Sequence, residues 1–236
     1  MKFLEKMMDN KQVIMYNAGV FGNITDELVA AVNWPKDVPT LSFSFAPFAP
    51  AGGAVKHGLK NNYVIRYMFG GKTSTLKPLG KALKGSPIVA REPASAKEAV
   101  AVTQDTLCRD SAAQKRKAGP AFAKELKRYL GNVRSGKVKS VLLFKNGRSV
   151  GIASYIDVVR LDGKKSSTFT WLWVDKRLPR AEYEDARFKA TSWVLKHARP
   201  YLASANFDYS KDAQQGDSRM GMQPYRIFFA RKGKHA

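Results

Sequence analysis

The sequence contains little cysteine, no long apolar run and few acidic residues. Its 236 residues include one cysteine, Cys108, so the chain cannot form an internal disulfide or a zinc site of several cysteines. The three histidines lack metal-binding spacing, and no metal is expected. No apolar stretch approaches the roughly 18 residues that span a bilayer, and the charges in the opening segment MKFLEKMMDN exclude a signal peptide. We therefore expect a globular protein of a reducing compartment, the cytoplasm, without a membrane span.

The scarcity of acids leaves a large excess of positive charge. Lysine and arginine number 41 against 19 aspartate and glutamate residues, which gives a formal net charge of +22 at pH 7. Such a charge attracts polyanions, so the expected partners are DNA or RNA, or an acidic protein surface.

The excess is concentrated between residues 115 and 148, where eleven basic residues accompany one acid, Glu125. One interpretation is a solvated helix face, and the other is a surface that contacts nucleic-acid phosphates. The few aromatic residues among the cations fit core positions, so no base-stacking surface is expected. The candidates for nucleic-acid binding are Lys115, Arg116, Lys117, Lys124, Lys127, Arg128, Arg134, Lys137 and Lys139.

The first 85 residues predict few regular elements. We expect a short helix at 26–32 and strands at 41–48 and 62–69, with the rest irregular. The Gly-, Pro- and Lys-rich stretch 72–85 reads as a connection. The sequence thus predicts an N-terminal extension, 1–85, and a main domain, 86–236.

After residue 85 the order of expected elements becomes regular. A strand at 87–91 precedes a helix that begins with Ser95 as N-cap and Glu98 in a capping box, and a second helix covers 121–130 and stops at Gly131. Strands at 140–144 and 149–159 flank an Asn146-Gly147 hairpin turn and precede a strand at 168–174. The remaining elements are a long helix at 182–198, a strand at 201–207, a short polar helix through 215 and a strand at 225–230.

This order, from residue 86 to 232, resembles the Gcn5-related N-acetyltransferase (GNAT) superfamily. The segment IVAREPASAKEAVAV resembles the opening strand and helix of that family, VLLFKNGRSVGIASY its second and third strands, and SRMGMQPYRIFFARK its closing pattern. The resemblance implies an α+β fold with a mixed, mostly antiparallel sheet flanked by helices. It also implies acetyl-CoA or another acyl-CoA as the acyl donor.

The glycine-rich motif with which this family binds the pyrophosphate of acetyl-CoA is degenerate here. The corresponding segment reads VDKRLPRAEYEDARFKA, and no glycine occurs between Gly163 and Gly216. Side chains obstruct a close backbone approach, and acids in the first helical turn oppose an anion at the helix N-terminus. The resemblance places the donor beside Val174, Lys176, Arg177, Arg180 and Ala181.

The resemblance also suggests where catalytic groups would lie. Asp175 follows the fourth strand of the domain, where a base acts in this family, and Tyr209 is nearest to the position of a tyrosine that protonates the leaving thiolate. Each has a structural alternative: Asp175 as a cap that precedes the long helix, and Tyr209 as a packing or surface-loop residue.

Three functions agree with these observations. The first is an N-acyltransferase that moves an acetyl or other acyl group from acyl-CoA to an amine. The second is a catalytically inactive binding or structural protein with a basic surface facing nucleic acid, for example in a virion or on a chromosome. The third is transfer from aminoacyl-tRNA, which only analogy of fold supports.

Overall fold

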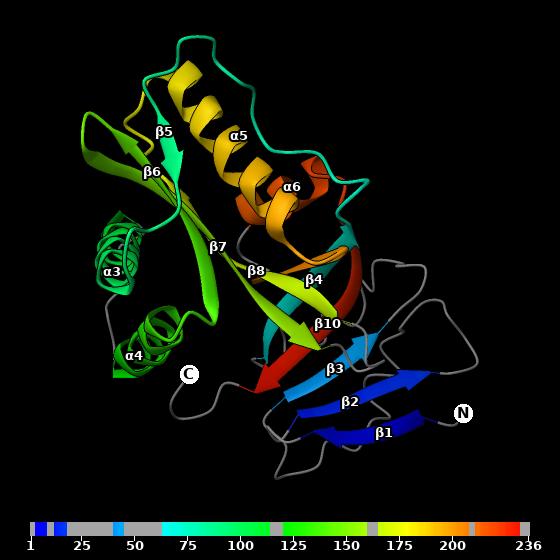
Figure 1. The fold of residues 1–236 in the computed structure, drawn as a ribbon. Helices are drawn as coiled ribbons and strands as arrows, with labels where there is room; N and C mark the ends of the chain where they lie inside the picture. Colours follow the sequence, from blue (N-terminus) through cyan, green and yellow to red (C-terminus); the bar gives the residue numbers. More distant parts are fainter. Residues whose placement is uncertain are drawn as a thin grey trace. The chain divides into compact units, whose positions relative to one another are not determined.

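The computed structural model describes the backbone of residues 3–8, 12–17, 40–44, 63–113, 120–159, 165–207 and 211–231, and side chains within 68–110, 126–159, 165–206 and 212–223. The chain divides into two compact units (Figure 1). Unit 1 comprises Met1–Gly70, Ser204–Ser218 and Met222–Ala236, and unit 2 comprises Gly71–Ala203 and Arg219–Gly221. The boundaries of these units differ from the division expected between residues 85 and 86. That division stays a prediction.

Unit 1 assembles its strands around the last strand of the chain. Its elements are β1 (Phe3–Met8), β2 (Gln12–Asn17), β3 (Thr40–Ser44), β4 (Tyr63–Lys72), α6 (Lys211–Arg219) and β10 (Gln223–Arg231). The strand order is β1-β2-β3-β10-β4, and β10 pairs antiparallel with β3 and with β4. The sequence predicted β3, β4 and β10 but missed β1 and β2. The expected helix at 26–32 lies outside the described residues.

Unit 2 contains the regular succession of elements that the sequence predicts. In chain order these are β5 (Val89–Arg91), α3 (Ala96–Ala113), α4 (Pro120–Arg134), β6 (Val138–Lys145), β7 (Arg148–Val159), β8 (Lys165–Val174) and α5 (Arg180–His197), followed by β9 (Tyr201–Phe207), of which only the first three residues belong to unit 2. The strand order is β5-β6-β7-β8-β9, and β5 to β8 pair antiparallel. The predicted α+β fold with a mostly antiparallel sheet is confirmed.

Local sequence explains where several of these elements turn or begin. Asn146 and Gly147 both have positive φ, 50° and 75°, as a two-residue hairpin turn between twisted strands requires. At the start of α3, Ser95 Oγ accepts a hydrogen bond from the Glu98 N–H, as predicted, while the Glu98 carboxylate accepts one from the N–H of Ala94. Side chains therefore satisfy one free donor of the first helical turn, the Glu98 N–H, and the Ala94 N–H just before the helix.

Helix α4 continues past Gly131, where the sequence predicted its end. Gly131 is exposed within the helix, and the chain turns away only at Gly136, whose φ is +71°. The N–H of Gly136 bonds to the Val133 carbonyl and that of Ser135 to the Gly131 carbonyl. The prediction was wrong because an exposed glycine lowers helix stability by only about 1 kcal/mol, whereas the packing of Val133 against Ala99 and Val138 keeps the last turn helical.

The helices of unit 2 cover opposite faces of its sheet. The Tyr155 hydroxyl of β7 donates to the carbonyl of His197 on α5. Its neighbour Ser154 lies on the other face of the sheet. On that face, the hydroxyl of Tyr129 in α4 lies 3.0 Å from the hydroxyl of Thr170 in β8 and forms a hydrogen bond with it. Figure 1 shows α5 on one side of β6 and β7, with α3 and α4 on the other.

The segment that precedes β5, residues 73–88, packs along α5, and we call it the strap. The Leu79 N–H donates to Thr191 Oγ1 at 2.9 Å, and the Leu83 N–H donates to Asp185 Oδ1 at 2.8 Å. Gly80 has a φ of +80°, and a Cβ there would lie 2.1 Å from the carbonyl oxygen of Glu184. The stretch that sequence composition suggested to be a connection is thus fitted to the helix by specific contacts.

Candidate functional site

The start of α5 lies beside the hairpin turn that joins β6 to β7. The N–H of Asp175, just after β8, bonds to the Val150 carbonyl, and the Lys145 ammonium at the end of β6 binds the Glu182 carboxylate at 2.6 Å. Residues 145–148 and 174–182 together carry five cations and two acids, a net charge of +3. The sheet thus brings two sequence-distant basic segments together at one end of α5.

The first turn of α5 has no side-chain cap. Pro179 is the N-cap residue, with φ −51° and ψ 144°, and it provides no side-chain hydrogen bond. The first intrahelical bond runs from the Tyr183 N–H to the Pro179 carbonyl. The N–H groups of Arg180, Ala181 and Glu182 therefore have no partner within the helix, and such groups at the positive end of the helix dipole attract anions.

The acids of this first turn, which the sequence predicted to repel an anion, are each paired with a cation. Glu182 binds Lys145 of β6. Glu184 lies 3.5 Å from Arg187, one turn later. Asp185 is fully buried, pairs with Lys189 at 2.8 Å and accepts hydrogen bonds from the strap. Their charges are compensated within unit 2, so the repulsion expected from sequence is reduced.

Asp175 is held by arginines. Its carboxylate accepts hydrogen bonds from the Arg177 side chain at 2.9 and 2.6 Å and from the Arg177 N–H at 3.1 Å, and Arg148 lies 3.8 Å away. These hydrogen bonds lower the pKa of Asp175 from 3.8 to about 2, against the opposing effect of burial. A carboxylate with so low a pKa is a weak base at neutral pH, and the geometry favours a structural role, in which Asp175 orders the loop that precedes the helix.

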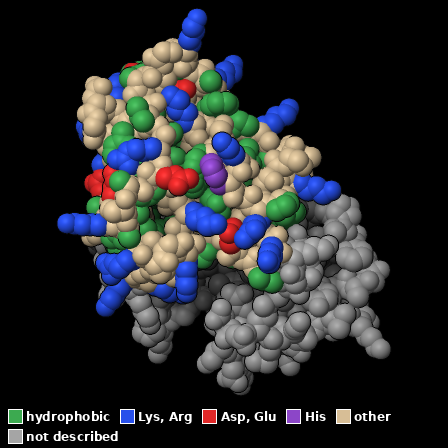
Figure 2. Space-filling view, in the orientation of Figure 1, with side chains coloured by type: hydrophobic (Ala, Val, Ile, Leu, Met, Phe, Trp, Pro, Cys, Tyr) green, Lys and Arg blue, Asp and Glu red, His purple; other side chains and the backbone are tan. Residues whose placement is uncertain are grey.

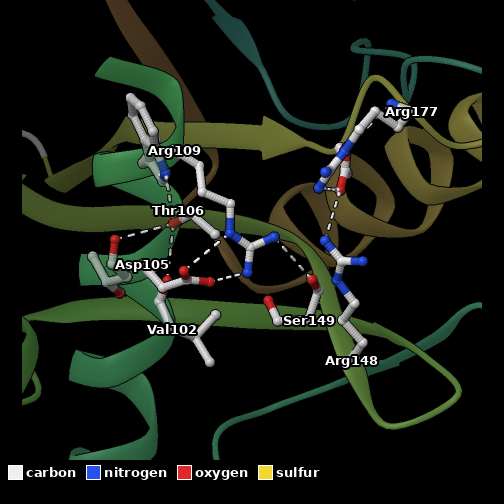
Figure 3. A network of polar contacts seen from close by, with 10 residues as sticks. Val102, Asp105, Thr106, Arg109, Arg148, Ser149 and Arg177 are labelled. Carbon is white, nitrogen blue, oxygen red and sulfur yellow. Dashed lines mark hydrogen bonds and ion pairs between the residues drawn. The ribbon is translucent and has the colours of Figure 1, made fainter. Parts of the chain in front are cut away.

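Sequence reasoning missed an arginine that links α3 to this end of the sheet. Arg109 forms an ion pair with Asp105, donates to the Ser149 carbonyl at 3.4 Å and places its guanidinium 5.2 Å from the Trp173 ring centroid. Figure 3 shows Arg109, Arg148 and Arg177 entering this region from three different segments. The i,i+4 spacing of Asp105 and Arg109 was the only local signal.

The residues proposed for the donor lie at the end of β8, in the loop after it and at the start of α5. Val174 is buried and ends the strand, whereas Lys176, Arg180 and Ala181 are exposed at the start of α5. Tyr209 lies outside the described residues, so its proposed role stays a prediction. No group of three or more His, Cys, Asp or Glu residues suited to a metal occurs in the described part of the chain.

The candidates for nucleic-acid binding do not form one group. Lys127, Arg128, Arg134 and Lys137 are exposed along α4 and the turn after it. Lys139 lies on the α5 face instead, where it pairs with Asp157 at 2.9 Å and lies over the ring of Tyr155. Nothing is described of residues 115–117, and only the backbone is described at Lys124. Within the described residues, no helix is long and apolar enough to cross a membrane.

Comparison with known proteins shows likeness at the level of structure. No protein-family model and no curated protein sequence matches the chain. A GCN5-related N-acetyltransferase from Kribbella flavida is 15% identical over 94% of this chain and 82% of its own, with a TM-score of 0.47. A tandem GNAT protein from the clavulanic acid biosynthesis pathway is 13% identical over 84% of this chain, which spans 65% of that protein, with a TM-score of 0.48.

A third similar structure is a functionally unknown conserved protein from Staphylococcus epidermidis, 13% identical over 83% of this chain and 73% of its own, with a TM-score of 0.48. The resemblance inferred from sequence rested on the succession strand, two helices, three antiparallel strands, long helix, strand, short helix, strand. The structure contains that succession as β5 through β10. The element order and the strand order of unit 2 therefore agree with the fold expected from the resemblance to the Gcn5-related N-acetyltransferases.

Proposed function

We propose that the protein is an acyltransferase that holds the phosphates of an acyl-CoA donor at the start of α5. The observation that carries this proposal is the uncapped first turn of α5, whose N–H groups at Arg180, Ala181 and Glu182 lie within a segment of net positive charge. A phosphate accepts hydrogen bonds from such groups and is stabilised by the helix dipole.

The residues present suit an anionic donor although the glycines of the family motif are missing. Lys176 and Arg180 are exposed and form no ion pair with any described residue, so their charges are available to phosphates. Arg177 is fixed by Asp175, and we assign Asp175 the positioning of that guanidinium. Bound acetyl-CoA or another acyl-CoA supplies the activated thioester, while these side chains hold it through its phosphates.

The proposed acceptor is an amine, which must lose a proton before or during attack on the thioester. Tyr209 is retained as the proposed proton donor to the leaving thiolate. Asp175 is not proposed as the base, because its pKa of about 2 and its contacts with Arg177 oppose proton transfer to it at neutral pH.

Calorimetric titration of the full chain with CoA tests the donor site. We expect binding of the wild type to CoA, and much weaker binding of pantetheine, which lacks the phosphates. A variant with Lys176→Gln and Arg180→Gln should bind CoA at least about tenfold more weakly, a loss of about 1.4 kcal/mol. Absence of heat with CoA at about millimolar concentration contradicts the proposal and favours the inactive binding protein.

A matched control carries the same change of charge at a distance. Lys165→Gln with Lys196→Gln alters two exposed cations, and Lys196 lies about 24 Å along α5 from Arg180 at 1.5 Å per residue. We expect this control to bind CoA within about twofold of the wild type. An equal loss of CoA affinity in both double variants would be an effect of net charge alone and would contradict a specific phosphate site.

A further inference from the structure

A second basic surface lies on α4, away from the start of α5. Lys127, Arg128, Arg134 and Lys137 are all exposed, and we call this group the α4 ridge. Lys127 and Arg134 are seven residues apart, which places them on one side of the helix, about 10 Å apart along its axis. Lys137 extends the ridge beyond the helix end into the turn.

The packing of α4 fixes this surface toward solvent. Tyr129 and Val133 face the interior, where Val133 is buried with Ala99 and Val138. The Tyr129 hydroxyl, bonded to Thr170, ties the helix to β8. The inward face therefore accounts for the stability of the helix, and the outward cations are not needed to hold it.

Among the residues whose side chains the structure describes, no acid compensates the α4 ridge; the side chain of Glu125, earlier in α4, lies outside them. Residues 126–137 contain four basic residues and no aspartate or glutamate. None of the four cations forms an ion pair with a residue whose side chain the structure describes. The first turn of α5 differs, because each of its three acids has a cationic partner. The described part of the ridge thus carries an excess of positive charge, and Figure 2 shows Lys and Arg predominating over Asp and Glu on one face of the described residues.

The side chains around these cations indicate which class of polyanion suits the α4 ridge. The exposed large hydrophobic residues in the described part of the chain are Val89 and Val159, and neither is on α4. The described part of the ridge thus offers neither an apolar wedge for a membrane surface nor an aromatic platform for single-stranded bases. Among nucleic acids, phosphate contact with a duplex is the mode of binding that remains.

The helix itself favours one form of duplex. The major groove of B-form DNA, about 12 Å wide, admits an α-helix, whereas the deep, narrow major groove of A-form RNA does not. We propose that the α4 ridge binds the phosphate backbone of duplex DNA, with α4 at the major groove and without reading the base sequence. This binding is independent of the acyl-CoA site, because the two surfaces share no residue.

Fluorescence anisotropy with a labelled DNA duplex of about 20 base pairs tests the ridge. For the full chain, we expect the logarithm of the binding constant to fall linearly with the logarithm of salt concentration between roughly 50 and 200 mM. The variant Lys127→Gln with Arg134→Gln should show a slope shallower by about 2 and an affinity loss of at least tenfold at the lower salt. Binding to unrelated DNA sequences should be reduced equally.

The control is Lys81→Gln with Lys84→Gln, which removes the same charge from exposed positions in the strap. Its slope and affinity should match the wild type. A second ridge variant, Arg128→Gln with Lys137→Gln, should reproduce the effect of the first and covers the case in which one variant fails to fold.

Three outcomes would overturn the proposal. One is an equal loss in the strap control and the ridge variants. Another is equal or tighter binding, sensitive to the ridge, to an RNA duplex of the same sequence or to vesicles of anionic lipid. The third is duplex DNA binding that neither ridge variant weakens.

Discussion

Helices α5 and α4 pack on opposite faces of one sheet, and they differ in how their charges are compensated. On α5, Glu182, Glu184 and Asp185 each have a cationic partner within unit 2. On α4, the exposed cations have no described acidic partner. The comparison shows that net charge alone does not locate a binding surface, because the paired charges of α5 hold the fold together while those of the α4 ridge remain available to an external anion.

The largest effect is expected at the buried acid of α5. Replacing Asp185 by Ala removes the acceptor of the Leu83 N–H and the Ser86 hydroxyl and leaves Lys189 without its acidic partner, with only the Ile88 carbonyl to bind. The free energy of unfolding should fall by about 3 kcal/mol, measured by urea denaturation with tryptophan fluorescence. Arg128→Ala on the α4 ridge should change it by no more than about 0.5 kcal/mol. Similar losses of unfolding free energy in both variants would contradict the difference proposed between the charges of α5 and those of α4.

A smaller difference in stability is expected between alanine variants of two glycines in the strap. Gly80 and Gly85 both have positive φ, but a Cβ at Gly80 would meet the Glu184 carbonyl, while one at Gly85 would have nothing within 4 Å. Gly85→Ala should cost only the backbone penalty of about 1 kcal/mol, and Gly80→Ala should cost at least about 2 kcal/mol more because the strap must move off α5. Thermal denaturation of the two variants checks this, and equal melting temperatures would contradict it.

The smallest effect concerns the pH dependence at Asp175. Its pKa is lowered from 3.8 to about 2, mainly by the side-chain hydrogen bonds from Arg177. The stabilisation is therefore complete above about pH 4 and is lost as the pH falls toward 2. Because the arginines are largely exposed, Asp175→Asn should lower the free energy of unfolding by only about 1 kcal/mol at pH 6.

The difference between wild type and Asp175→Asn should shrink over that acidic window, which urea denaturation at a series of pH values would measure. The ridge variant Lys127→Gln should show no such window, because the described part of the ridge contains no carboxylate. A difference at Asp175 that stays constant down to pH 2 would contradict the ion pair with Arg177.

Local signals in the sequence predicted most of unit 2. The Asn146-Gly147 turn and the Ser95 cap each act within a few residues, and the elements that they bound were found where expected. The predicted end of α4 at Gly131 was wrong because glycine destabilises the helix less than the packing of its last turn stabilises it. Strands β1 and β2 lacked a clear alternation of apolar and polar residues and depend on pairing with each other and with β3.

The candidate site was less predictable, because its decisive contacts join distant segments. The pairings of Glu184 with Arg187 and of Asp185 with Lys189 follow helical spacing and could have been inferred. The partner of Glu182 is Lys145, 37 residues away, which only the sheet register brings near. Likewise, Lys139 and its neighbour Val138 point to opposite faces, so a charge count along the sequence grouped Lys139 with cations from which the sheet separates it.

The place of β10 between β3 and β4 has a consequence for synthesis of the chain. Ile227 is opposite Phe43 on one side and Tyr67 on the other, so this strand closes ladders across more than 150 residues. During translation, the edges of β3 and β4 that pair with β10 stay unpaired until β10 has been made. Such non-local closure is slow, and exposed edges invite pairing with other chains. We therefore expect the nascent protein to depend on chaperones until β10 emerges.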